Sequence, residues 1–218
     1  MHVVAIASQK GGAGKSTFAV NLAVLANRLS EPALLIDMDE QGSLSVWQRL
    51  RKAETPLVVP SRPEELAEVL DAARRDGRIR WVFLDAPPLS NESVAEMMKA
   101  ASLVVIPARP AVFDLAAIAS TITMAHDLRR PFFVALNAVP PRRGLTEATD
   151  VMIARKAIRQ LNAPLWRGSV AQRSAFAQAL ANGLAVTEYE ANGAAAREMN
   201  SLWADVQRVS EAMSDHTP

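Results

Sequence analysis

The chain has 218 residues, of which half are hydrophobic and 22% are charged, proportions typical of a globular α/β domain with a buried core. The formal net charge of +1 indicates no particular partner. The absence of cysteine excludes disulfides, thiolate zinc sites and iron–sulfur clusters.

The ends of the chain carry no recognisable targeting signal. The N-terminus lacks the charged and then apolar run of a signal peptide. No apolar stretch approaches the roughly 20 residues that a membrane-spanning helix needs. We therefore expect a cytoplasmic protein.

Short apolar runs alternate with longer helical patterns, which predicts an α/β fold with a mostly parallel, doubly wound sheet flanked by helices. The expected strands are 3–7, 33–37, 57–59, 81–84, 103–106 and 132–136. The expected helices are 16–29, 43–52, 63–75, 91–101, 111–129, 146–162, 173–182 and 193–213. Because no linker or repeat interrupts this pattern, we expect one domain over 1–218 with a flexible tail at about 214–218.

Polar residues or proline stand at the carboxyl ends of four expected strands. These residues are Asp37, Asp85, Pro107 and Asn137. In open parallel sheets, ligands bind outside that edge. The candidate site therefore lies where these strands end.

A glycine-rich loop, KGGAGKST at residues 10–17, joins the first strand to the first helix. Its glycines let successive backbone N–H groups turn toward phosphate oxygens, and the following helix adds its positive end. The strict pattern G-x-x-x-x-G-K-[ST] fails only because Gln9 replaces the first glycine. The alternative interpretation is a tight strand-to-helix turn without a ligand.

The loop resembles the deviant Walker A motif of the ParA/MinD family of P-loop ATPases, and the resemblance spans nearly the whole chain. Further segments that resemble the family are DMDEQGS at 37–43, LDAPP at 84–88, PARP at 107–110 with Asp114 and Leu115, Asn137, and 173–189. Glu40 stands where the family usually has proline, which leaves the geometry after Asp39 in question. The resemblance implies a single-domain P-loop NTPase.

The resemblance implies a site for ATP and Mg²⁺. Lys15 would bind the β- and γ-phosphates, and Lys10 would reach the nucleotide of a second subunit, so that two ATP molecules lie between the halves of a homodimer. Asp39 would orient the attacking water. Nucleotide-binding residues would be Gly11, Gly12, Ala13, Gly14, Lys15, Ser16, Thr17 and Asn137, and metal-binding residues Ser16, Asp37 and Asp85.

Each of these residues also has a structural interpretation. Lys10 could be a solvated loop lysine, and Asp37 could only support the segment that follows it. Asp39 could cap the helix expected at 43–52. Asn137 could satisfy a turn at the end of its strand.

Charge is unevenly distributed in the second half of the chain. Residues 129–173 contain nine Lys or Arg against two acids, a local net charge of +7, whereas 174–218 have a net charge of −4. The resemblance to ParA-like proteins implies that basic side chains there bind DNA phosphates without sequence preference; the alternative is a solvated helix face. The candidates are Arg142, Arg143, Arg155, Lys156, Arg159, Arg167 and Arg173.

The resemblance implies an ATPase that dimerises on ATP, binds nucleoid DNA and positions a plasmid, a chromosome or a protein cargo. A ParB-like protein or cargo adaptor would stimulate hydrolysis. Two alternatives stay open: a MinD-like membrane-associated ATPase, and an ATP-dependent ligase resembling cobyrinate diamide synthase or dethiobiotin synthetase. The short acidic C-terminus argues against membrane binding.

Overall fold

A computed structural model describes residues 1–39, 41–87, 91–141 and 146–214. Its centre is a six-stranded, all-parallel sheet with the order β3-β2-β4-β1-β5-β6. The strands are β1 (His2–Ile6), β2 (Leu34–Asp37), β3 (Leu57–Pro60), β4 (Trp81–Asp85), β5 (Leu103–Ala108) and β6 (Phe132–Leu136). The prediction of an α/β fold is confirmed, and the sheet is parallel throughout.

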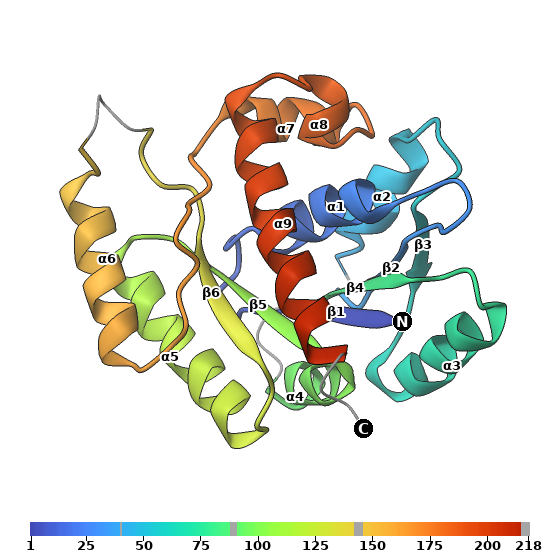
Figure 1. The fold of residues 1–218 in the computed structure, drawn as a ribbon, viewed down its shortest axis with the longest axis horizontal. Coiled ribbons are helices and arrows are strands. Elements are labelled where there is room, and N and C mark those ends of the chain that lie inside the picture. The colour runs from blue at the N-terminus through green and yellow to red at the C-terminus, as the bar shows by residue number, and fades with distance from the viewer. Residues whose placement is uncertain (40, 88–90, 142–145, 215–218) are drawn as a thin grey trace.

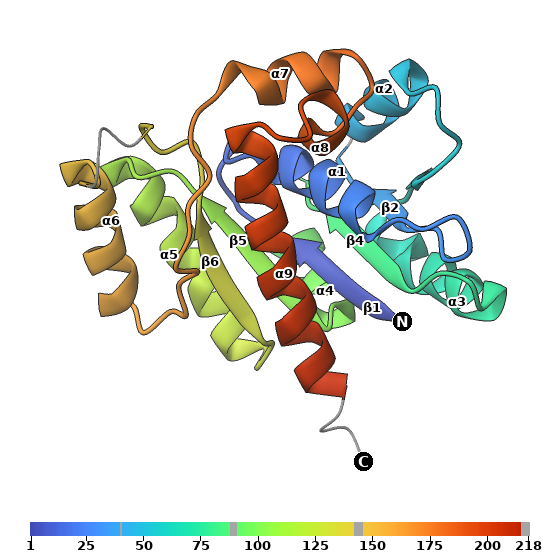
Figure 2. The same ribbon diagram turned by 45° about the horizontal axis from the view of Figure 1, so that its top comes forward.

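Helices cover both faces of the sheet (Figure 1). One face carries α1 (Lys15–Ala26), α2 (Ser43–Leu50), α7 (Ser174–Ala181), α8 (Val186–Tyr189) and α9 (Ala194–Ser214). The other carries α3 (Leu66–Asp76), which follows the 3₁₀ turn η1 (Pro63–Glu65), with α4 (Asn91–Ala100), α5 (Val112–Asp127) and α6 (Thr149–Gln160). Figure 2 shows α7 and α8 at one end of α9, beside α1 and α2.

Alternate residues of the central strands enter separate cores. In β1, Val3 and Ala5 pack with the α3–α6 face, whereas Val4 and Ile6 pack with the α1 and α9 face. This period of two explains why the strands read as continuous apolar runs, since both faces are buried. The edge strand β3 departs from the pattern, because Leu57 at its start is exposed.

All six predicted strands are present, and the helices agree within a few residues at their ends. The expected helix 63–75 is divided, because its first turn, which contains Pro63, is 3₁₀ and the α-helix begins at Leu66. The four-residue helix α8 was missed, since so short an element has no periodicity to detect. In the part of the chain that the structure describes, no helix is long and apolar enough to span a membrane.

Candidate nucleotide-binding site

The loop after β1 turns at two glycines with left-handed backbone. Gly12 has φ +73°, and Gly14, which precedes α1, has φ +101°. Residues with a β-carbon rarely adopt these angles. The turn directs the chain from the centre of the sheet into the amino terminus of α1, where backbone N–H groups and the helix dipole favour an anion.

Asn137 holds this loop from the end of β6. Its Nδ2 donates a hydrogen bond of 2.7 Å to the carbonyl oxygen of Ala13, and its side chain is almost completely buried. A β-carbon on Gly14 would lie only 2.1 Å from the same Nδ2. The structure therefore gives Asn137 a bracing role in the loop, while its expected contact with the nucleotide remains a proposal.

Two buried ionisable residues, Lys15 and Asp85, lie close enough to the loop to influence each other's charge. Lys15 begins α1, and Asp85 ends β4, the neighbour of β1. Burial lowers the pKa of Lys15, although the charges of Asp85 and Asp39 partly offset this effect. Burial raises the pKa of Asp85 to about 7, against the opposing influence of Ser16 and Lys15.

The Ser16 hydroxyl is near enough to lower the pKa of Asp85, but no hydrogen bond of normal geometry reaches either of its fully buried carboxylate oxygens within the described residues. Buried polar atoms are normally satisfied, so such a pair indicates a missing partner. Hydrated Mg²⁺ fits this environment, because it binds through one or two carboxylates, a P-loop hydroxyl and substrate phosphates. Within the described residues, no group of three or more histidines and acids is placed so that it could hold a metal ion by itself.

Asp37 lies next to Asp85 in the register of β2 and β4, but its carboxylate has other partners. Its Oδ2 accepts hydrogen bonds from the backbone N–H and the hydroxyl of Ser45, at 3.2 and 3.3 Å. Its Oδ1 accepts one from the N–H of Asp39 at 3.3 Å. Burial raises the pKa of Asp37, and these hydrogen bonds oppose the rise. Asp37 thus links the sheet edge to the first turn of α2.

The alternative prediction that Asp39 caps α2 is wrong. Its Oδ1 accepts a hydrogen bond of 2.9 Å from the N–H of Gln41, and its carbonyl accepts one from Gly42. Asp37 satisfies the helix N–H instead, because the carboxylate at the end of the strand is already next to Ser45. Asp39 is only half-buried and lies at the edge of the site, while Glu40 is outside the described residues.

A cavity of about 890 Å³ adjoins these acids on the β2–β3 side. Its lining includes Asp37, Asp39, Arg62, Glu65 and Ser93. The cavity lies at the carboxyl edge of the sheet, next to Asp37 and Asp39. It therefore offers room for a second group beside a bound nucleotide.

Lys10 lies at the opposite rim of the loop. Its Nζ forms an ion pair of 3.4 Å with Asp114, in the first turn of α5, and 44% of its side chain remains exposed. The preceding Gln9 donates from Nε2 to Asn91 of α4 at 2.5 Å. Asp114 was not predicted as a contact of Lys10. The sequence did offer a signal for this contact: Asp114 is an acid in the first turn of α5, and this helix follows β5, which pairs with β1.

The basic region does not form a single cationic surface. Arg155 is 11% exposed and binds both carboxylate oxygens of Glu147 and the carbonyls of Trp166 and Gly168. The prediction that Arg155 binds DNA is therefore wrong, because its guanidinium joins the segments before and after α6.

Arg173 is also engaged within the protein. Its guanidinium donates to both oxygens of Glu198 in α9, and these contacts raise its pKa. Lys156, Arg159 and Arg167 are exposed, so these candidates present cations to the solvent. Arg142 and Arg143 lie outside the described residues.

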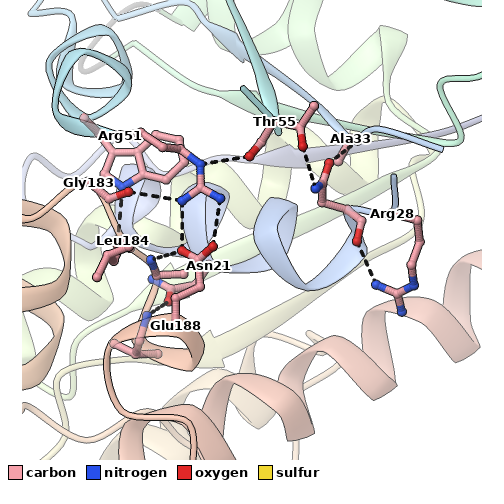
Figure 3. Close-up of polar contacts among 12 residues, drawn as sticks. Asn21, Arg28, Ala33, Arg51, Thr55, Gly183, Leu184 and Glu188 are labelled. Atoms are coloured by element: carbon pink, nitrogen blue, oxygen red, sulfur yellow. Dashed lines mark hydrogen bonds and ion pairs between the residues drawn. The ribbon is translucent and has the colours of Figure 1, made fainter. Parts of the chain in front are cut away.

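The two helices that leave the site are anchored to one segment, residues 183–188 (Figure 3). In α1, Asn21 accepts a hydrogen bond from the N–H of Val186 at 2.9 Å. At the end of α2, the buried Arg51 donates to both oxygens of Glu188 at 2.8 Å and to the carbonyl of Gly183 at 3.1 Å. These contacts fix α1 and α2 relative to each other behind the site.

A glycine-rich loop between a parallel strand and a helix, a buried lysine at the start of that helix and an unpaired buried aspartate define a P-loop nucleotide-binding protein. Residues 4–186 match the family described as the CobQ/CobB/MinD/ParA nucleotide binding domain, and the chain belongs to that family.

Similar proteins include the maintenance of carboxysome distribution protein A of Gloeobacter kilaueensis, 33% identical over 97% of this chain and 94% of its own. The chromosome-partitioning ATPase Soj of Thermus thermophilus is 30% identical over 58% of this chain and 62% of its own. Among solved structures, the Mg-ADP complex of the septum site-determining protein MinD from Pyrococcus horikoshii has a TM-score of 0.77 at 15% identity, covering 97% of this chain and 98% of that one. This last likeness concerns the fold alone.

Proposed function

We propose that this protein is a ParA-type positioning ATPase that dimerises on ATP, binds DNA without sequence preference and releases it when a partner stimulates hydrolysis. The observation that carries this proposal is the combination of three residues at the loop: the buried Lys15, the buried Asp85 without a hydrogen-bond partner, and the half-exposed Lys10. Lys15 and Asp85 suit one nucleotide, and Lys10 suits a second subunit.

Ser16 and Asp85 would hold Mg²⁺, which neutralises the charge that develops as the terminal phosphoryl group leaves. Lys15 and the loop N–H groups of residues 11–17 would bind the phosphates. Asp39, half-buried at the edge of the site, would orient the water. Asp37 would act mainly by holding α2, because three hydrogen bonds engage its carboxylate.

Lys10 would exchange its contact with Asp114 for phosphate oxygens of the facing subunit's nucleotide. An extra cation stabilises the transition state of phosphoryl transfer, and its supply by a second subunit makes hydrolysis depend on dimerisation. Intrinsic hydrolysis should be slow, since the dimer must persist until it meets its partner.

DNA would bind to Lys156, Arg159 and Arg167, together with Arg142 and Arg143. Contacts to phosphates alone make binding salt-sensitive and independent of sequence. The protein would therefore be cytoplasmic and associated with the nucleoid. A ParB-like protein or a cargo adaptor would complete the system.

The similarity to a carboxysome-distribution protein over 97% of this chain favours a large protein assembly as the cargo. The shorter match to a chromosome-partitioning ATPase supports a chromosome or a plasmid less strongly. A pull-down from the native host with the Asp39→Ala protein and ATP, followed by identification of the bound proteins and DNA, would distinguish these cargoes.

The cavity beside Asp39 supports a second candidate, an ATP-dependent ligase that transfers the terminal phosphoryl group to a small acceptor. Arg62 lines this cavity and could bind an acceptor carboxylate. Phosphate release that requires a small carboxylic acid, and not DNA, would favour this alternative.

The decisive experiment measures binding to unrelated DNA duplexes by the Asp39→Ala protein with ATP, with ADP and without nucleotide, at two salt concentrations. We expect salt-sensitive binding with ATP only. The double charge reversal Lys156→Glu/Arg159→Glu should weaken DNA binding uniformly across sequences. Lys15→Ala should abolish the ATP-dependent DNA binding. Absence of DNA binding in every state would overturn the proposal, and liposome sedimentation would then test a MinD-like role.

A further inference from the structure

Arg109 directly follows the buried strand β5, at the carboxyl edge of the sheet. Because β5 pairs with β1, this position lies beside the glycine-rich loop. A β-carbon placed on Gly12 would lie 3.7 Å from Nη2 of Arg109. The guanidinium therefore lies against the turn of the loop, on the α5 side where Lys10 also lies.

Arg109 is exposed, and no hydrogen bond or ion pair reaches it from the residues that the structure describes. Lys10, by contrast, is partly neutralised by Asp114. The rim of the loop thus carries two cations and one anion. An additional anion placed there would be attracted by the unmatched charge of Arg109.

The position of Lys10 indicates where that anion comes from. Lys10 pairs with Asp114 in the first turn of α5, and Arg109 lies in the segment that joins β5 to this helix. The two cations therefore lie on the same side of the loop. A phosphate that reaches Lys10 from a facing subunit also comes close to Arg109.

The backbone around Arg109 is restrained. Before Arg109, Pro107 lies opposite Ala135 in the register of β5 and β6. After it, the ring of Pro110 fixes the φ angle of that residue. A guanidinium presents a planar fork of donors that matches phosphate oxygens better than an ammonium group. Arg109 is thus suited to bind phosphate from a fixed base.

We propose that Arg109 binds a phosphate group of the nucleotide held by the facing subunit, beside Lys10. The inference rests on the proposed ATP-dependent dimer, because Lys10, on the same side of the loop, is the residue proposed to meet the facing subunit's nucleotide. Arg109 is a phosphate-contacting residue of the paired state and contributes nothing to nucleotide binding by a single subunit.

The test compares Arg109→Ala, Arg109→Lys and the matched control Arg75→Ala, an exposed arginine of α3, each in the Asp39→Ala background. Sedimentation velocity with saturating ATP measures dimerisation, and a fluorescent ADP analogue measures binding by the single subunit. We expect Arg109→Ala to weaken dimerisation about tenfold or more, as for loss of a charge-assisted contact. Dimerisation of Arg109→Lys should lie between that of Arg109→Ala and that of the parent protein, and Arg75→Ala should dimerise like the parent. The affinity for the ADP analogue should not change in any variant.

Two results would overturn the inference. Dimerisation equal to that of the parent protein would show that Arg109 does not act across the interface. A parallel loss of ADP affinity would place its contact within its own subunit. If the Asp39→Ala parent itself stays monomeric with ATP, the proposed function fails and this inference fails with it, whereas failure of Arg109→Ala alone leaves the proposed function intact.

Discussion

The Nδ2 of Asn137, at the end of β6, donates a 2.7 Å hydrogen bond to the carbonyl oxygen of Ala13 in the glycine-rich loop. This bond joins the edge strand of the sheet to a loop that starts from its centre, 124 residues earlier in the chain. It also explains why Gly14 has no room for a side chain. The conformation of the loop therefore depends on a residue far away in sequence.

Asn137→Ala should weaken binding of ATP and ADP alike, because the loop loses its brace. The unsatisfied Ala13 carbonyl should also reduce the free energy of unfolding by about 1–3 kcal/mol. Isothermal titration with ATP, ADP and GTP tests this expectation. A loss confined to adenine nucleotides would instead support base recognition by Asn137.

Gly14→Ala should abolish nucleotide binding, because its β-carbon would meet Asn137 and the backbone has φ +101°. The double variant Gly14→Ala/Asn137→Ala removes the collision but keeps the backbone strain, so recovery should be partial. Titration with a fluorescent ADP analogue checks both variants. Full recovery in the double variant would show that the left-handed backbone is unimportant.

Arg51→Ala should destabilise the fold by about 1–3 kcal/mol, since it leaves the partly buried Glu188 without its hydrogen-bonded cation. Burial raises the pKa of Glu188, but the hydrogen bonds from Arg51 outweigh this and hold it below its usual value. The ion pair therefore stabilises the protein at neutral pH and is lost as the pH falls through the folded-state pKa. Urea unfolding at pH 7 and pH 3 measures both effects, with the exposed Arg49→Ala of the same helix as the control.

The strands and the glycine-rich loop could be predicted because their signals are local. A strand buried on both faces is a continuous apolar run, and the loop joins it directly to a helix. The ion pair between Arg155 and Glu147 and the hydrogen bond from Ser45 to Asp37 depend on tertiary packing. Spacing along a helix or a strand could therefore not reveal them. Asn137 shows the same limit, because its position at a strand end was evident and its partner was not.

Asp85→Asn should stabilise the protein without nucleotide and metal at pH 8 and have little effect near pH 4. Burial raises the folded-state pKa of Asp85 to about 7 from 3.8. The folded state therefore holds its proton more tightly, and stability falls as the pH rises between these values, by an upper limit of roughly 4 kcal/mol. Thermal unfolding across this pH range tests the slope, with the exposed Asp71→Asn as the control. Parallel pH curves for Asp85→Asn and the unmodified protein would contradict the expectation.

Asp114→Asn should strengthen ATP-dependent dimerisation, because Lys10 loses its partner within the subunit. Since 44% of the Lys10 side chain is exposed, the ion pair contributes about 1 kcal/mol or less, so the gain should not exceed about fivefold. Lys10→Ala should abolish dimerisation, and Asp127→Asn at the other end of α5 should leave it unchanged. Sedimentation equilibrium with ATP in the Asp39→Ala background measures all three variants. Weaker dimerisation of Asp114→Asn would show that Asp114 supports Lys10 in the paired state and does not restrain it.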